Sequence, residues 1–177
     1  MQVAWACPLI SKCLFDSNKV VKTVAKKWFQ RFSVRDKEFI QNIKKHGFSS
    51  TAVFNDDGTH FCYSTGFWEN LSHPEIVIYG LDADVAHDLL WVCFNRITEG
   101  AAFKHLDQSD QMLNNYDCMF KLITVFHLKE HLCFADWYYC REPFEALQLF
   151  WPDKEGRFSW KEGVDHAFAK DQPDLSV

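Results

Sequence analysis

The spacing of apolar residues predicts a helix in the segment before Gly47. Ser33 is the expected N-cap and Asp36 stands at the capping-box position, which would satisfy two backbone N–H groups at the start of this helix. Gly47 is the expected end, because glycine readily adopts the left-handed conformation that closes many helices. The apolar residues between them share one helical face: Phe39, Ile40 and Ile43.

From residue 51 the spacing becomes typical of strands. Residues 51–54 and 59–64 flank the segment Asn55-Asp-Asp-Gly58, and its Asp-Gly pair favours the positive backbone angles of a hairpin turn. The continuous apolar run from Ile76 to Tyr79 is typical of a buried central strand. A hairpin followed by a central strand is therefore predicted.

The second half alternates less regularly. Asp82 is the expected N-cap of a helix from Ala83 to Thr98, closed by Gly100. Residues 118–126 and 146–151 are predicted strands, residues 132–139 a short helix or aromatic loop, and the tail from residue 154 mostly irregular. Strands interspersed with two or three helices predict a single α+β domain over residues 33–177, built on a mostly antiparallel sheet.

Composition agrees with one globular domain. The chain has 177 residues, of which 47% are hydrophobic, so it can bury one sizeable core. Aromatic residues make up 16%, which favours an aromatic-lined pocket or an interface. The seven cysteines are dispersed without a C-x-x-C pair, a pattern typical of structural thiols in a reducing compartment. We therefore expect a cytoplasmic protein, without a secretory leader or a membrane span.

Positive charge is concentrated near the N-terminus. Six basic residues and no acidic residue lie between Ser17 and Arg35, and because the formal net charge is −5, the remainder of the chain carries −11. Apolar residues recur through this segment at helical spacing, which predicts a basic amphipathic helix within an N-terminal extension, residues 1–32. Such a helix can dock on its own acidic domain or contact a membrane surface, a nucleic acid or an acidic partner.

The stretch from Phe61 to Glu75 is rich in polar and aromatic side chains and is the predicted site. The residues favour acid–base chemistry by His73 with Glu75 or Glu69, because imidazole titrates near neutrality and a carboxylate can orient it. The alternative is a structural turn in which the imidazole of His73 caps a backbone carbonyl. No nucleophile elbow and no phosphate-binding glycine loop occurs in the sequence.

Three blocks of sequence carry a resemblance to a known family. They are Tyr63-Ser-Thr-Gly66, then His73-Pro-Glu75 leading into the strand at 76–81, and Ala146-Leu-Gln-Leu-Phe-Trp-Pro-Asp153 with Gly156-Arg-Phe-Ser-Trp160. Together they resemble the family called domain of unknown function 4262, over residues 39–174. The family usually has proline where this chain has Ser159. The resemblance implies a small soluble bacterial domain without an established activity.

The resemblance adds further candidate residues to the site. Beside the catalytic candidates His73 and Glu75, it implies that several ligand-binding positions converge: Tyr63, Thr65, Glu69, Gln148, Trp151, Asp153 and Trp160. Aromatic rings beside amide and carboxylate groups are what a small-molecule pocket requires. Each of these residues can also serve only to fill the core or to satisfy a neighbouring backbone group.

The order His127-Leu-Lys-Glu130-His131 matches the H-x-x-E-H pattern of some zinc enzymes. In those enzymes the two histidines lie on one face of a helix. Because His127 ends an apolar run that is typical of a strand, we expect a surface turn and no metal site. The sequence identifies no cofactor.

Two functions from different classes remain open. The first is a small ligand-binding or enzymatic domain with an aromatic and polar cleft around residues 63–75 and 148–160. The second is a protein-interaction module of immunity or adaptor type, which would use an acidic, aromatic-rich surface. The expected partner is thus a small molecule or a protein and not a nucleic acid, and the oligomeric state stays open.

Overall fold

A single mixed sheet forms the centre of the molecule. The computed structural model describes residues 33–113 and 116–176, and the predicted N-terminal amphipathic helix lies outside these residues. The sheet has the strand order β1-β2-β3-β6-β5-β4, and neighbouring strands are antiparallel except for the parallel pair β3 and β6. The strands are β1 (Ser49–Phe54), β2 (His60–Thr65), β3 (Glu75–Tyr79), β4 (Gln108–Leu113), β5 (Tyr116–Leu122) and β6 (Ala146–Phe150).

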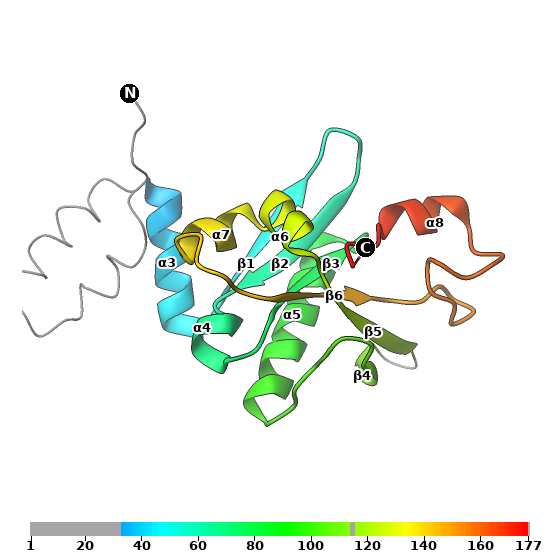
Figure 1. Ribbon diagram of the computed structural model, residues 1–177, viewed down its shortest axis with the longest axis horizontal. Helices are drawn as coiled ribbons and strands as arrows, with labels where there is room; N and C mark the ends of the chain where they lie inside the picture. The colour runs from blue at the N-terminus through cyan, green and yellow to red at the C-terminus, as the bar shows by residue number, and fades with distance from the viewer. Residues whose placement is uncertain (1–32, 114–115, 177) are drawn as a thin grey trace, which may run out of the picture.

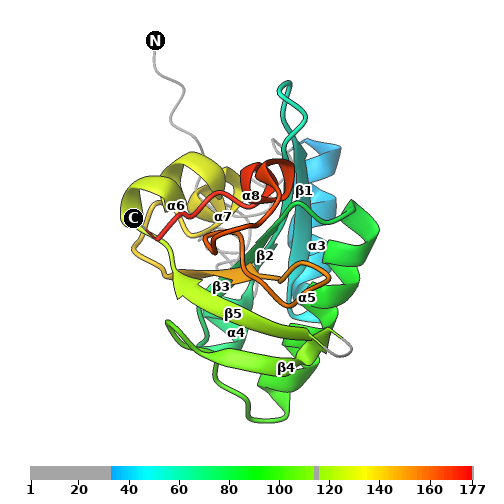
Figure 2. The same ribbon diagram turned by 90° about the vertical axis from the view of Figure 1, so that its right-hand side faces the viewer.

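Helices cover both faces of this sheet (Figures 1 and 2). They are α3 (Val34–His46), α4 (Phe67–Leu71), α5 (Ala83–Thr98), α6 (Val125–His131), α7 (Cys133–Tyr138) and α8 (His166–Asp171). The prediction of a single α+β domain on a mostly antiparallel sheet is confirmed, with more helices than the two or three expected. Among the described residues, none of these helices is long and apolar enough to cross a membrane.

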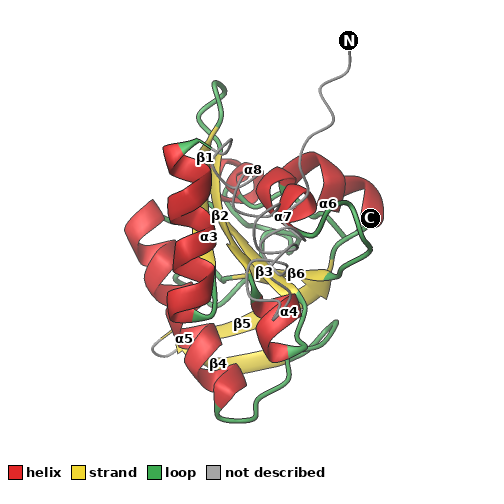
Figure 3. Cartoon of the chain, turned by 90° about the vertical axis from the view of Figure 1, so that its left-hand side faces the viewer, coloured by secondary structure: helices red, strands yellow, loops and turns green. Residues whose placement is uncertain are grey.

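The predicted ends of the first helix are confirmed. The Ser33 side chain accepts from the backbone N–H of Asp36, and the Asp36 carboxylate accepts from the backbone N–H of Ser33. Gly47 closes α3 in the left-handed conformation at φ 89°. Helix α3 then packs beside the edge strand β1, as Figure 3 shows from the left-hand side of the molecule.

Alternating side chains of the strands build two hydrophobic cores. On one face, Ile76 and Ile78 of β3 pack with Leu89, Leu90 and other residues of α5. On the opposite face, Val77 and its neighbours on β2 and β6 pack against α6 and α7. The central strand β3 is therefore buried on both faces, as the continuous apolar run predicted.

The predicted strand over residues 118–126 is wrong in its second half. Strand β5 ends at Leu122, and the hydroxyl of Thr124 accepts from the N–H of His127 at 3.3 Å, which begins helix α6. Val125 and Phe126 gave the segment a strand-like appearance but are 68% and 71% exposed at the start of that helix. His127 and His131 consequently lie on one helix, contrary to the expectation of a surface turn.

Three further elements were not predicted. Strand β4 is short and largely polar, helix α4 spans five residues, and helix α8 lies in the tail that was expected to be mostly irregular. The side chain of Asp165 starts α8 by accepting from the N–H groups of Ala167 and Phe168. Short elements of this kind lack the apolar repeat on which the sequence-based prediction depends.

Most of the described cysteines are thiols, as expected. Cys62, Cys93, Cys118 and Cys133 are free, and burial raises the pKa of both Cys62 and Cys118 to about 12. Cys140 is disulfide-bonded, so the expectation of structural thiols is wrong for this residue. The cytoplasmic location, which rested partly on that expectation, stays a prediction.

Candidate functional site

Glu75 is the centre of a buried polar cluster between the ends of several elements. Its side chain is 0% exposed at the start of β3. One carboxylate oxygen, Oε2, accepts from the Ser64 hydroxyl at 2.5 Å. The other, Oε1, accepts from the backbone N–H groups of Gly66 at 2.9 Å and Trp68 at 3.0 Å, and from the Tyr139 hydroxyl. The carboxylate thus joins the end of β2, the start of α4 and the end of α7.

Gly66 makes this cluster possible. Its φ of 123° is a conformation that glycine adopts without steric cost, and a Cβ there would lie 2.6 Å from the carbonyl oxygen of Gly47. Because Gly66 has no side chain, its backbone can lie close to the Gly47 carbonyl. The chain can then turn from β2 into α4 and direct the N–H groups of Gly66 and Trp68 at Glu75.

Burial raises the pKa of Glu75, and the hydrogen bonds from Ser64, Tyr139, Trp68 and Gly66 act in the opposite direction. A carboxyl group with four donors around it has little capacity left to bind a substrate. The geometry therefore gives Glu75 a structural role, while its predicted catalytic role stays a prediction.

His73 is also buried and has partners on both ring nitrogens. Nδ1 lies 2.7 Å from the carbonyl oxygen of Pro74, and Nε2 accepts from the backbone N–H of Phe103 at 3.0 Å. Burial lowers the pKa of His73. With 4% exposure, this imidazole does not lie at the mouth of a cleft, and the arrangement fits the structural alternative, in which it caps backbone groups.

Of the remaining candidates before Glu75, Tyr63 and Thr65 are buried, whereas Glu69 is partly exposed. The Tyr63 hydroxyl accepts from the backbone N–H of Phe134 at 3.1 Å, and burial raises its pKa to about 12. Glu69 accepts from the Tyr138 hydroxyl at 2.7 Å. Thr65 is fully buried, and its hydroxyl has no hydrogen-bond partner among the described residues.

In the last block, Gln148 fixes the C-terminal segment, and Trp160 packs on its neighbours. Gln148 donates to the carbonyl of Pro173 at 2.6 Å and accepts from the N–H of Leu175 at 3.0 Å. Trp160 stacks on Phe158, with the Lys121 ammonium group 3.8 Å from the centre of its indole ring. The candidates between Tyr63 and Glu75 and those between Gln148 and Trp160 therefore do not converge on a single cleft.

Two of the candidates do line a pocket. Trp151 and Asp153 border a hollow with a volume of about 580 Å³ just after β6, next to the end of β4 and the start of β5. The other lining residues were not identified from the sequence: Leu113, Tyr116, Pro152, Lys154, Glu155, Arg157, Asp165 and Phe168. The aromatic members Tyr116 and Phe168 come from segments without a clear apolar repeat, so no pattern connected them with Trp151.

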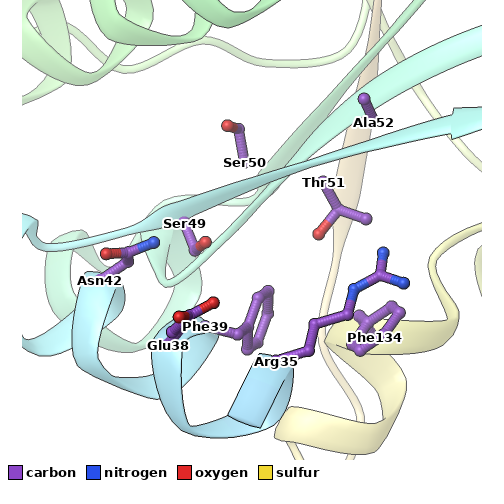
Figure 4. A pocket seen from close by; sticks show the side chains of 9 residues that line it. All are labelled: Arg35, Glu38, Phe39, Asn42, Ser49, Ser50, Thr51, Ala52 and Phe134. Carbon is purple, nitrogen blue, oxygen red and sulfur yellow. The ribbon is translucent and has the colours of Figure 1, made fainter.

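A second, smaller hollow lies between α3 and the edge strand β1. It has a volume of about 200 Å³, and Figure 4 shows side chains from α3, β1 and the start of α7 around it. Arg35 lies over the ring of Phe134 at 5.2 Å, and most of the other lining side chains are polar. Of the predicted site residues, none belongs to the lining of this hollow.

These features define the class of protein. It is a small α+β domain with a mixed six-stranded sheet, a buried polar cluster around the Glu75 carboxylate, and an apolar pocket beside the sheet. The chain belongs to the family described as domain of unknown function (DUF4262), which matches residues 42–165. Neither the comparison with curated proteins nor the comparison with solved structures found a match. The family resemblance is confirmed, and its implied bacterial origin stays a prediction.

Proposed function

We propose that this domain binds a small, largely apolar molecule in the pocket beside Trp151. The observation that carries the proposal is the pocket itself, whose volume of about 580 Å³ is within the usual range for small-molecule sites. Trp151, Phe168 and Tyr116 supply apolar surface, and charged side chains are part of the same lining. Apolar walls provide affinity, and a few charged groups provide orientation.

The main wall of the pocket is held in place before any ligand arrives. The indole N–H of Trp151 donates to the carbonyl of Tyr79 at 2.8 Å, and the Phe168 ring lies edge-on at 4.9 Å from the Trp151 ring. The side-chain amide of Gln172 bonds to both the N–H and the carbonyl of Trp151. Binding to a rigid site avoids much of the entropy cost of ordering side chains.

The charged residues of the lining suggest which ligand the pocket prefers. Arg157 is paired with Asp153 at 2.8 Å and with Glu155 at 3.0 Å, and Asp165 caps helix α8. Lys154 is the lining cation that is not engaged in these bonds. We infer that the preferred ligand carries an aromatic or aliphatic body with an acidic group placed toward Lys154.

The proposal can be tested with 1-anilinonaphthalene-8-sulfonate, a probe that combines an apolar ring system with an anionic group. We expect saturable binding to the folded protein, weakened at least about tenfold by Phe168→Ala, since one lost aromatic contact of about 1.4 kcal/mol corresponds to that factor. Trp160→Ala is the matched control, because Trp160 is aromatic, partly exposed and outside the pocket lining. Equal loss in both variants, or no saturable binding, would contradict the proposal.

The protein-interaction module is the second candidate function, supported by the hollow along β1. An edge strand presents unpaired backbone groups that an added strand can bind, and the hollow beside it includes Arg35, Glu38 and Asn42. Failure of the pocket to bind any probe would favour this alternative. The acid–base role predicted for His73 and Glu75 is not needed in either case, because neither residue lines the Trp151 pocket.

A further inference from the structure

Helix α6 brings together three metal-ligating side chains, of which Glu130 is exposed and His127 and His131 are partly buried. The Nδ1 of His127 and the Nε2 of His131 each lie 3.7 Å from Oε2 of Glu130. Each of the three side chains offers one ligand atom that lies within 4.8 Å of the ligand atoms of the other two. Residues three and four apart on a helix are neighbours on its surface, so the spacing of the sequence and the winding of the helix together produce this cluster.

The separations are close to those of a metal site. A zinc ion holds nitrogen and oxygen ligands at about 2.0–2.2 Å, so two ligands in a tetrahedral arrangement are about 3.3–3.6 Å apart. Both distances to Glu130 exceed this spacing by a few tenths of an ångström. The Glu130 side chain is 57% exposed and can move to close the gap.

His131 is oriented by residues from the sheet. Its Nδ1 lies 2.7 Å from the Tyr79 hydroxyl, which leaves Nε2 directed at Glu130. The ring also packs edge-on against Phe61, with 5.7 Å between ring centres. A hydrogen bond to the second ring nitrogen is the arrangement that fixes most metal-binding histidines.

We propose that His127, Glu130 and His131 bind a divalent transition-metal ion through two imidazole nitrogens and one carboxylate oxygen. This donor set suits Zn²⁺ and its neighbours, whereas Mg²⁺ and Ca²⁺ prefer oxygen ligands alone. Three protein ligands leave a position for water on the exposed side of the cluster. The proposal replaces the expectation of no metal site, because that expectation placed His127 at the end of a strand, whereas both histidines belong to α6.

The test is a calorimetric titration of the full-length, untagged protein with ZnCl₂. We expect one ion per chain in the unmodified protein and no measurable binding in His127→Ala and His131→Ala. Glu130→Gln removes the carboxylate charge at an exposed position and so reports on the site without risk to the fold. We expect this variant to bind zinc at least about tenfold more weakly. Removal of a residue that only supports a metal ligand already weakens metal binding at least about tenfold, and removal of a ligand itself should weaken it more.

His166→Ala is the matched control, because His166 is exposed on α8 and outside the cluster. It should bind zinc as the unmodified protein does. Cys133 needs a separate variant, since it is exposed and its sulfur lies 3.3 Å from the carbonyl oxygen of Glu130. Absence of binding in the unmodified protein, or binding lost in Cys133→Ala and kept in His127→Ala, would overturn the assignment.

Discussion

Replacement of Glu75 by alanine should cost more stability than any other single polar substitution near β3. The change leaves four donors without their acceptor: the hydroxyls of Ser64 and Tyr139 and the N–H groups of Gly66 and Trp68. An unsatisfied buried donor costs about 1–3 kcal/mol. Because Gly66 and Ser64 keep other contacts and the terms are not additive, we expect a total loss of about 3–5 kcal/mol.

Glu75→Gln is the informative companion. Glutamine keeps an acceptor oxygen for the two N–H groups and the Tyr139 hydroxyl, and its amide can donate to the oxygen of Ser64. It therefore resembles the protonated form of Glu75, and we expect a loss below about 1.5 kcal/mol at neutral pH, the usual net contribution of one hydrogen bond.

The pKa of Glu75 gives the sign of the pH dependence. Burial raises this pKa above its usual 4.5, so the folded state holds the proton more tightly than the unfolded state. Its contribution to stability is fully present below pH 4.5 and is lost as the pH rises through the folded-state pKa, with a slope of at most about 1.4 kcal/mol per pH unit. Glu75→Gln should lack this component of the slope.

Urea unfolding followed by circular dichroism, repeated between pH 4.5 and 8, measures the stability of the unmodified protein and of both variants. The reasoning is refuted if Glu75→Ala loses less than about 1 kcal/mol, the typical effect of an ordinary substitution. It is also refuted if the unmodified protein and Glu75→Gln show the same pH dependence above pH 4.5.

Two further stability predictions follow from the same region. His73→Ala should cost about 1–3 kcal/mol of stability, because it leaves the N–H of Phe103 without an acceptor. Burial lowers the pKa of His73 below 6.5, so the stability that His73 contributes is present above pH 6.5 and is lost as the pH falls through its folded-state pKa. Urea unfolding at pH 5 and pH 8 measures this difference. Gly66→Ala should cost about 2–4 kcal/mol, because a Cβ would meet the Gly47 carbonyl oxygen at 2.6 Å. Gly58→Ala is the control, because Gly58 also has a positive φ of 85° but no atom lies within 4 Å of the added Cβ. This variant should lose only the backbone strain of about 1 kcal/mol. Equal losses of stability in both variants would contradict the steric argument.

The sequence predicted elements that carry their own local signals. Helix α5 has the predicted bounds because an amphipathic repeat and a terminal glycine mark it, and the hairpin of β1 and β2 follows from the Asp57-Gly58 turn. The end of β5 was missed because Val125 and Phe126 are apolar without being buried. The capping hydroxyl of Thr124 was the signal that could have corrected it.

The candidate site was less predictable, because its contacts join residues far apart in the sequence. The Tyr139 hydroxyl reaches Glu75 across 64 positions, and the N–H of Phe103 reaches His73 across 30. Both contacts depend on how the connections fold back over the sheet, and no spacing rule encodes them. The sequence located polar residues that matter, and only the fold shows that most of them hold the structure together.

Tyr79 offers a variant that separates the pocket from the metal site, since it contacts both through different groups. Its carbonyl oxygen accepts from the Trp151 indole at the pocket, whereas its hydroxyl contacts His131 of the metal cluster. Tyr79→Phe removes only the hydroxyl and retains the ring stacked on Phe61 at 4.6 Å. We therefore expect zinc affinity to fall about 10–100-fold, as for other outer-shell partners of metal ligands, and probe affinity at the pocket to stay unchanged. Parallel titrations of one protein preparation with ZnCl₂ and with 1-anilinonaphthalene-8-sulfonate measure both. A loss of probe binding without a loss of zinc binding would show that the hydroxyl supports the pocket, and the assignment of Tyr79 to the metal site would then be wrong.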